Sequence, residues 1–146
     1  MEIESRARRL SVVQGQRQVV DFALQRRAVL AAVSSGRTRV DEVCDAGEYL
    51  LRAARFHGRL SEITCPICRK EPLTLVSWVF GESLGQVSGS ARTADELERL
   101  AASQAEFSVH DVEVCRTCRW NHLSLSYVLG TAPEPRRRRQ RRTASE

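Results

Sequence analysis

The chain has 146 residues, a net charge of +5, 42% hydrophobic residues and 28% charged residues. This length fits one domain with an appendage, and this composition excludes a chain that is disordered throughout. No apolar run approaches the ~18 residues that cross a bilayer. The charged start of the chain does not resemble a secretory signal, so we expect a cytoplasmic protein with no membrane partner.

The positive charge lies at the two ends of the chain. Residues 1–59 hold 11 arginines against 7 acidic residues, and residues 131–146 hold 6 arginines against 2 glutamates. Residues 60–130, in contrast, hold 6 basic residues against 9 acidic ones. Contacts with the phosphates of a nucleic acid are therefore expected from the ends and not from the middle.

The first part of the chain has the apolar spacing of helices. Val20 and Leu24 recur at helical spacing, and so do Leu50 and Ala54. Residues 17–59 are therefore predicted to form a helical hairpin or a three-helix unit. The predicted segments are a flexible N-terminus (1–16), a helix (17–33), a connector with room for one helical turn (39–46) and a second helix (48–57).

After residue 58 the pattern becomes that of a sheet. Leu123, Leu125, Tyr127 and Leu129 alternate with two serines and a valine, as in a strand with one buried face. The predicted segments are strands over 73–80, 106–114 and 122–129, a short strand near 86–87, and a short connector over 58–64.

A helix is predicted between these strands. Thr93 and Glu96 form a capping box, in which the hydroxyl accepts from the Glu96 amide while the Glu96 side chain reaches back. This predicts a helix over 94–102, inserted in a sheet subdomain that spans 60–130. Residues 131–146 have the composition of a disordered, arginine-rich tail.

Four of the five cysteines form two identical pairs. Cys65 and Cys68 are separated by two residues, and so are Cys115 and Cys118. Each pair can form a tight turn, or knuckle, and two knuckles complete a tetrahedron of thiolates at ~2.3 Å from one Zn²⁺. The predicted fold class is therefore α+β, with the helical unit packed on an antiparallel zinc-ribbon sheet that carries a helical insertion.

The zinc is expected to be structural. Four thiolates fill the coordination sphere, and neither a catalytic motif nor a site for a small-molecule substrate is evident. A redox dithiol at Cys65 and Cys68 is the alternative, although Pro72 argues against the helix that such a dithiol opens. We interpret His122 as a histidine at the start of a strand rather than a ligand, and Cys44 as a small buried apolar residue.

Several stretches of the sequence resemble an actinobacterial family known only as a domain of unknown function. The similarity covers roughly residues 18–130 and implies a small cytoplasmic protein with a zinc ribbon, without an activity or substrate. The stretches are 20–30, 43–46, 50–58, the knuckle 65–68, 118–123 and 128–130.

Two functions fit these features. The first is a non-enzymatic zinc-ribbon module associated with nucleic acid or with a nucleoprotein machine of transcription or translation, which is an analogy at the level of the fold. Aromatic residues for stacking on unpaired bases are sparse, at 5% of the chain. The alternative is a protein–protein adaptor in a larger assembly, with a purely structural zinc. The candidate nucleic-acid-binding residues are Arg52, Arg55, Arg59, Arg136, Arg137, Arg138, Arg139, Arg141 and Arg142.

Neither half is expected to fold alone. The segment 1–59, with no metal or disulfide, is marginal as a domain, and the apolar side of the strand at 122–129 needs a cover. We therefore expect the helices to pack on the sheet.

Overall fold

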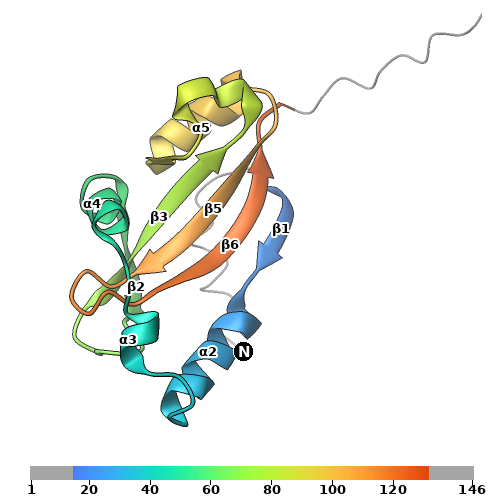
Figure 1. The fold of residues 1–146 in the computed structure, drawn as a ribbon. Coiled ribbons are helices and arrows are strands. Elements are labelled where there is room, and N and C mark those ends of the chain that lie inside the picture. Colours follow the sequence, from blue (N-terminus) through green and yellow to red (C-terminus); the bar gives the residue numbers. More distant parts are fainter. Residues whose placement is uncertain (1–14, 132–146) are drawn as a thin grey trace, which may run out of the picture.

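The computed structural model describes residues 15–131, which form one antiparallel sheet with helices packed on it (Figure 1). The strand order is β1-β6-β5-β3-β2, and the short strand β4 pairs with β3. This is the α+β class that the sequence predicts. The elements are β1 (Arg17–Asp21), α2 (Ala23–Ser34), α3 (Val40–Val43), α4 (Glu48–His57), β2 (Arg59–Thr64), β3 (Pro72–Phe80), the 3₁₀ segment η2 (Glu82–Val87), β4 (Ser90–Arg92), α5 (Ala94–Ser103), β5 (Phe107–Val114) and β6 (Asn121–Leu129).

Two β-hairpins meet at the centre of the sheet. β2 and β3 form the first hairpin, β5 and β6 form the second, and β3 pairs with β5. The turns of both hairpins lie at the end of the sheet that is remote from α5 (Figure 1). The two cysteine pairs occupy these turns, so that Cys68 and Cys115 lie side by side although they are 47 residues apart.

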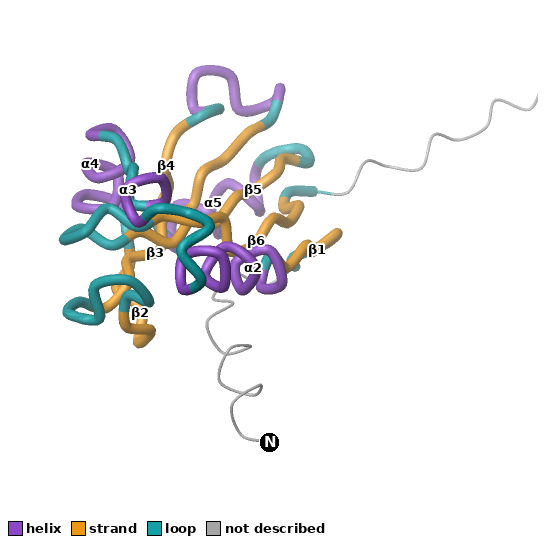
Figure 2. Tube along the Cα trace, turned by 60° about the horizontal axis from the view of Figure 1, so that its bottom comes forward, coloured by secondary structure: helices purple, strands orange, loops and turns teal. Residues whose placement is uncertain are grey.

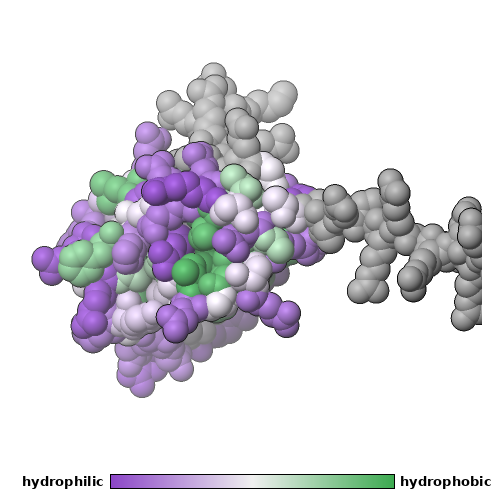
Figure 3. Space-filling model, turned by 90° about the horizontal axis from the view of Figure 1, so that it is seen from above, coloured by the Kyte–Doolittle hydropathy of each residue, from purple (hydrophilic) through white to green (hydrophobic). Residues whose placement is uncertain are grey.

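α5 begins at the predicted capping box. Thr93 Oγ1 accepts a hydrogen bond from the Glu96 amide (3.3 Å), and the Glu96 carboxylate accepts one from the Thr93 amide (3.1 Å). The fully buried Leu97 then packs with Val79 and Val109 on one face of the sheet. Seen from the α5 end, the surface is mainly hydrophilic around a small apolar area (Figure 3).

α4 covers the opposite face of the sheet. Val76 and Val79 of β3 point to different faces, because successive residues of a strand alternate between the two. Ala53 and Ala54 of α4 pack with Val76 and Val114, and these small side chains let the helix lie close to the strands. The prediction that the helices of residues 17–59 pack on the sheet is thereby confirmed, but they do not cover the apolar side of β6 as expected, because Tyr127 and Leu129 pack with Leu97 of α5 on the other face.

α2 and α3 pack at the end of the sheet that holds the hairpin turns. Val29 and Leu30 of α2 and Val43 of α3 lie against a cluster that includes the fully buried Trp120 and Leu73. Figure 2 views the molecule from this end, with α2 and α3 toward the viewer. The predicted metal site therefore lies where the helices meet the sheet.

The helix predicted over 17–33 starts too early. Arg17–Asp21 is the strand β1, which pairs with β6, and α2 begins only at Ala23. Asp21 Oδ1 accepts a hydrogen bond from the Ala23 amide (2.8 Å), which favours a helix start at this point. The consecutive Val19 and Val20 favour an extended backbone, and β6 offers them an unpaired edge.

The prediction of a short connector over 58–64 is also wrong. Residues Arg59–Thr64 form the strand β2, which pairs with β3 at the edge of the sheet. Leu60 and Ile63 are largely exposed, so this strand has no buried alternating face for the sequence pattern to reveal. As a consequence, Arg59 does not share a helix face with Arg52 and Arg55.

The short strand predicted near 86–87 is part of η2, and the strand in this region is β4. Gly85 and Gly89 adopt positive φ values (56° and 84°), which favour tight turns over an extended strand. The flexible N-terminus and the arginine-rich tail lie largely outside the described residues, so those interpretations stay predictions. Within residues 15–131 no helix is both long and apolar enough to cross a membrane.

Candidate metal centre

The two knuckles bring four sulfur atoms together. The Sγ atoms of Cys65, Cys68, Cys115 and Cys118 all lie within 4.8 Å of one another. The closest approaches join different knuckles, at 3.6 Å for Cys65–Cys118 and 3.6 Å for Cys68–Cys115. Four ligands about 2.3 Å from a tetrahedral ion lie about 3.8 Å from one another, so this group could hold one metal ion.

Both knuckles have a similar pair of backbone hydrogen bonds. In the first, the Cys65 amide donates to Glu71 O (2.8 Å) and the Arg69 amide to Cys65 O (3.1 Å). In the second, the Cys115 amide donates to the carbonyl of Trp120 (2.8 Å) and the Arg119 amide to the carbonyl of Cys115 (3.0 Å). In each knuckle, one hydrogen bond thus joins the two ends of the turn and the other lies within it.

The residue after the second cysteine of each knuckle has a left-handed backbone. The φ values are 57° for Arg69 and 71° for Arg119, a region that side chains with a Cβ rarely adopt. An amide within each turn donates to the first sulfur: Ile67 N to Cys65 Sγ at 3.4 Å, and Cys118 N to Cys115 Sγ at 3.4 Å. These donors stabilise a negatively charged thiolate.

Burial determines how readily the thiols ionise. Desolvation raises the pKa of Cys65, of Cys115 and of Cys118, the last to about 12. The Lys70 amide, in contrast, donates to Cys68 and lowers its pKa. A metal must therefore displace protons from these buried thiols, and its affinity is expected to rise with pH.

Polar contacts of both knuckles and of the strand β5 surround the sulfurs. Trp120, which is fully buried, donates from Nε1 to Glu113 Oε2 (3.2 Å). Glu71 of the first knuckle accepts a hydrogen bond from Thr117 of the second, so the two turns are linked beside the sulfurs. These contacts orient the knuckles without taking a position at the metal.

Arg119 links the second knuckle to the start of α4. Its guanidinium donates to Ala46 O (3.3 Å) and to Glu48 Oε1 (2.9 Å), while the Ala46 amide donates to Arg119 O (3.1 Å). Asn121 Nδ2 adds a hydrogen bond to Asp45 Oδ1 (2.8 Å). Arg119 thus holds the loop between α3 and α4 against the second knuckle.

Cys44 lies beside the four sulfurs, which the sequence did not predict. This half-buried residue follows α3, and its Sγ is 3.9 Å from the Sγ of Cys118. No spacing signal could have revealed this proximity, because the two residues are 74 positions apart. His122 is not part of the group: its ring stacks on Trp120 at 6.0 Å, and its Nδ1 lies 2.7 Å from Leu123 O. This agrees with a histidine at the start of a strand.

The arginines predicted to contact nucleic acid have different environments. Arg52 and Arg55 are exposed on α4, and Arg116 of the second knuckle joins them around a hollow of about 290 Å³. Arg59 of β2 instead forms an ion pair with the buried Asp111 of β5 (3.7 Å). The six arginines of residues 136–142 lie outside the described part of the chain.

The cysteine pairs occupy β-hairpin turns. A redox dithiol of the kind considered above lies at the start of a helix, whereas here Cys65–Cys68 leads into the strand β3 and Cys115–Cys118 leads into the strand β6. Four thiolates from two facing turns instead form a closed set of ligands, typical of a metal that stabilises a fold.

Comparisons with known proteins identify the family. Residues 13–143 match the family described as "Family of unknown function (DUF5318)", and the chain belongs to this family. It is 70% identical over 113 residues to uncharacterized protein Rv0049 of Mycobacterium tuberculosis and to uncharacterized protein Mb0050 of Mycobacterium bovis. Each match covers 77% of this chain and 82% of the relative. No solved structure matches the chain significantly.

Proposed function

We propose that this protein is a non-enzymatic, cytoplasmic zinc-ribbon module that binds nucleic acid. Binding takes place on the arginine surface, which consists of Arg52 and Arg55 of α4 and Arg116 of the second knuckle. The observation that carries the zinc assignment is the set of four sulfur atoms within 4.8 Å of one another. Tetrahedral sites made only of thiolates favour Zn²⁺ among the common divalent ions.

The zinc has a structural role in this proposal. Cys65 and Cys115 are almost fully buried, and four thiolates leave no position on the ion for water or a substrate. Zinc binding and folding are then coupled, because the unfolded chain does not hold the two knuckles together. A site that needs reduced thiols also fits the cytoplasm, where cysteines are kept reduced.

An excess of positive charge on one surface supports nucleic-acid binding. Arg52, Arg55 and Arg116 surround the same hollow, and Glu48 is the acidic residue among its neighbours. The Glu48 carboxylate pairs with Arg119 at 2.9 Å, and among residues 15–131 none of the other three arginines forms an ion pair, so their guanidinium groups can contact phosphates. The arginine-rich tail of residues 131–146 adds further positive charge.

The salt dependence of binding tests this surface. The affinity for a short duplex DNA is measured by fluorescence anisotropy over a range of salt concentrations for the zinc-loaded protein. The variant Arg52→Ala, Arg55→Ala, Arg116→Ala is called the α4 triple variant. If all three residues contact phosphates, it should lower the magnitude of the slope of log affinity against log salt concentration by about 2.7. Removing residues 131–146 should lower it further.

The matched control removes three other exposed arginines. The variant Arg27→Ala, Arg37→Ala, Arg99→Ala loses the same charge from α2, the loop after it and α5. It should keep a steeper slope than the α4 triple variant. Equal slopes for the two triple variants, or no binding at low salt by zinc-loaded protein, would contradict the proposal.

A further inference from the structure

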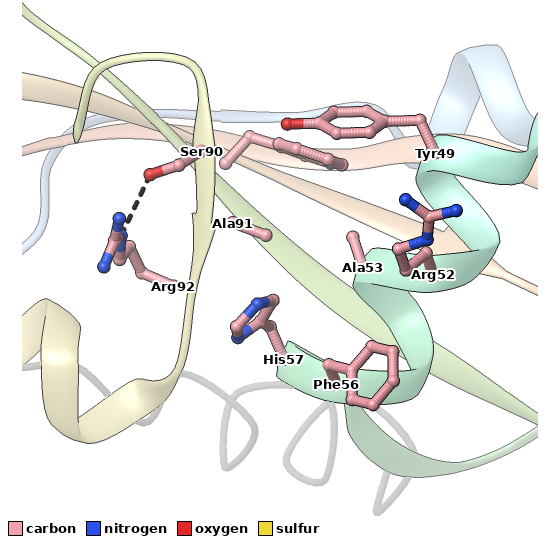
Figure 4. A pocket seen from close by; sticks show the side chains of 9 residues that line it. Tyr49, Arg52, Ala53, Phe56, His57, Ser90, Ala91 and Arg92 are labelled. Atoms are coloured by element: carbon pink, nitrogen blue, oxygen red, sulfur yellow. Dashed lines mark hydrogen bonds between the residues drawn. The ribbon is translucent and has the colours of Figure 1, made fainter. Parts of the chain in front are cut away.

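A second hollow, of about 540 Å³, lies between α4 and β4 and shares Arg52 with the arginine surface. Figure 4 shows Ala53 of α4 and Ala91 of β4 on its two sides, with Tyr49 and His57 at different ends. The small alanine side chains leave this space open. Its volume is within the range of pockets that hold small ligands.

Three aromatic residues that are scattered in the sequence gather at this hollow. Tyr49 and Phe56 come from the same side of α4, and Trp78 comes from β3. The ring centres of Tyr49 and Trp78 are 5.4 Å apart, and the angle between the ring planes is 30°. Tyr49 is 67% exposed and Phe56 is 63% exposed, so flat ring surfaces remain accessible to a ligand. The overall scarcity of aromatic residues therefore does not exclude stacking here.

Cationic and polar groups surround these rings. Arg52 lies between Tyr49 and Phe56 in the sequence of α4 and forms no ion pair within residues 15–131. Arg92, on the far side, is paired with Glu96 at 2.8 Å and donates from Nε to Ser90 Oγ (2.9 Å). The free positive charge thus lies on the α4 side, where the hollow meets the arginine surface.

We propose that this hollow binds an unpaired nucleotide of a single-stranded nucleic acid, with its base on Tyr49 and Trp78 and its phosphate on Arg52. This inference rests on the proposed function and names the form of nucleic acid. Every base has a flat face that can stack on an aromatic ring, and stacking next to a cationic groove is how single strands are bound without a fixed sequence. The faces of a base in a duplex are covered by its neighbours, so a paired base cannot enter.

The two hollows adjoin, and this determines the path that a bound nucleic-acid strand would follow. Arg52 and Phe56 line both, and the Arg55 guanidinium lies 5.3 Å from the centre of the Phe56 ring. A strand whose base occupies the space beside Ala53 would place its next phosphates near Arg55 and Arg116. An acidic peptide would match the charge but not the open ring faces, so we favour a nucleic acid.

The test compares a single-stranded RNA of about 12 nucleotides with a duplex of the same sequence and with an abasic strand of the same length. Tyr49→Ala should weaken binding of the single strand about 5- to 150-fold, which is the effect of losing one stacked base, and leave duplex binding unchanged. Tyr49→Phe should restore it, because the ring surface is retained. Phe80→Ala removes an exposed aromatic residue outside the hollow and should have no effect. Unchanged zinc content and melting temperature show that the variants are folded.

The outcomes separate this inference from the proposed function. If the α4 triple variant weakens both forms of nucleic acid while Tyr49→Ala weakens neither, the arginine surface stands and the base site is overturned. Equal affinity for the abasic and the intact strand would also overturn the base site. The same conclusion would follow if the protein bound a glutamate-rich peptide and Tyr49→Ala weakened that binding. Absence of binding to every nucleic acid would contradict both proposals.

Discussion

Arg26 of α2 and Glu113 of β5 form a two-point ion pair, with Arg26 Nε 2.5 Å from Glu113 Oε1 and Nη2 3.1 Å from Oε2. Glu113 also accepts the hydrogen bond from Trp120 Nε1 (3.2 Å). Trp120 belongs to the cluster that surrounds the cysteines. One buried carboxylate therefore joins α2, the central strand β5 and the cluster around the cysteines.

Arg26→Ala should lower the free energy of unfolding by about 2–3 kcal/mol. The Glu113 side chain is only 5% exposed, so the substitution leaves a buried carboxylate with Trp120 as its remaining partner. Arg27→Ala, which removes the exposed neighbour, should stay within about 0.5 kcal/mol of the wild type. Urea unfolding of the zinc-loaded proteins measures both. Similar losses for the two variants would show that the ion pair has no special role.

Gly58→Ala should destabilise the protein by about 1–3 kcal/mol, because there is no room for a methyl group. A Cβ at this position would lie 2.4 Å from Ala54 O and 2.4 Å from Thr74 Cγ2, where α4 passes into β2. Gly47→Ala, at the N-cap of α4, meets nothing within 4 Å and should cost less, because only the preference of this position for glycine over alanine is lost. Thermal melting of the two variants checks this contrast, and a Gly58→Ala protein as stable as Gly47→Ala would refute it.

Arg69→Gly should stabilise the protein by about 0.5–1 kcal/mol, because glycine adopts the left-handed backbone of the first knuckle without strain. Arg119→Gly relieves the same strain in the second knuckle but loses the contacts with Ala46 and Glu48. It should therefore bring no gain. Chemical unfolding at constant zinc concentration distinguishes the two variants, and a greater stabilisation by Arg119→Gly would disprove this reasoning.

The buried Asp111 should make stability depend on pH. Desolvation raises its pKa above the ordinary 3.8, although the hydrogen bond from Ser77 and the charge of Arg59 act in the opposite direction. The folded state thus holds the proton more tightly than the unfolded state. The contribution of this group to stability is complete below pH 3.8 and is lost as the pH rises through the folded-state pKa.

Asp111→Asn should remove this dependence. The free energy of unfolding of the wild type, relative to that of the variant, is expected to fall as the pH is raised from about 4 toward 7, with zinc in excess. The measurement is a series of denaturant titrations of both proteins at matched pH values. A difference that stays constant or increases with pH would show that folding does not raise the pKa of this carboxyl.

Local signals in the sequence predicted part of the fold and of the site. The Cys-x-x-Cys spacing depends only on the geometry of one turn, and the capping box of Thr93 and Glu96 depends only on the first turn of α5. The bounds of α4 follow from an amphipathic pattern closed by Gly58. These features need no knowledge of distant residues.

Long-range features could not be predicted in this way. β1 and β2 are edge strands whose pairing depends on the free edges of β6 and β3, and their largely exposed residues show no buried periodicity. Cys44 approaches Cys118 only after α3 packs on the sheet. Likewise, Trp78 meets Tyr49 because α4 crosses β3, which the spacing along the chain does not show.

Native mass spectrometry of the folded protein tests the central claim, a structural zinc held by four cysteines, most directly. The wild type should carry one zinc ion per chain, and Cys44→Ser should carry the same amount, because Cys44 lies beside the four sulfurs without belonging to the ligand set. Cys115→Ser should lose the ion together with the compact charge-state distribution of the folded chain. The account would be contradicted if the folded wild type carried no metal, or carried iron in place of zinc. It would also be contradicted if Cys115→Ser retained its zinc while Cys44→Ser lost it.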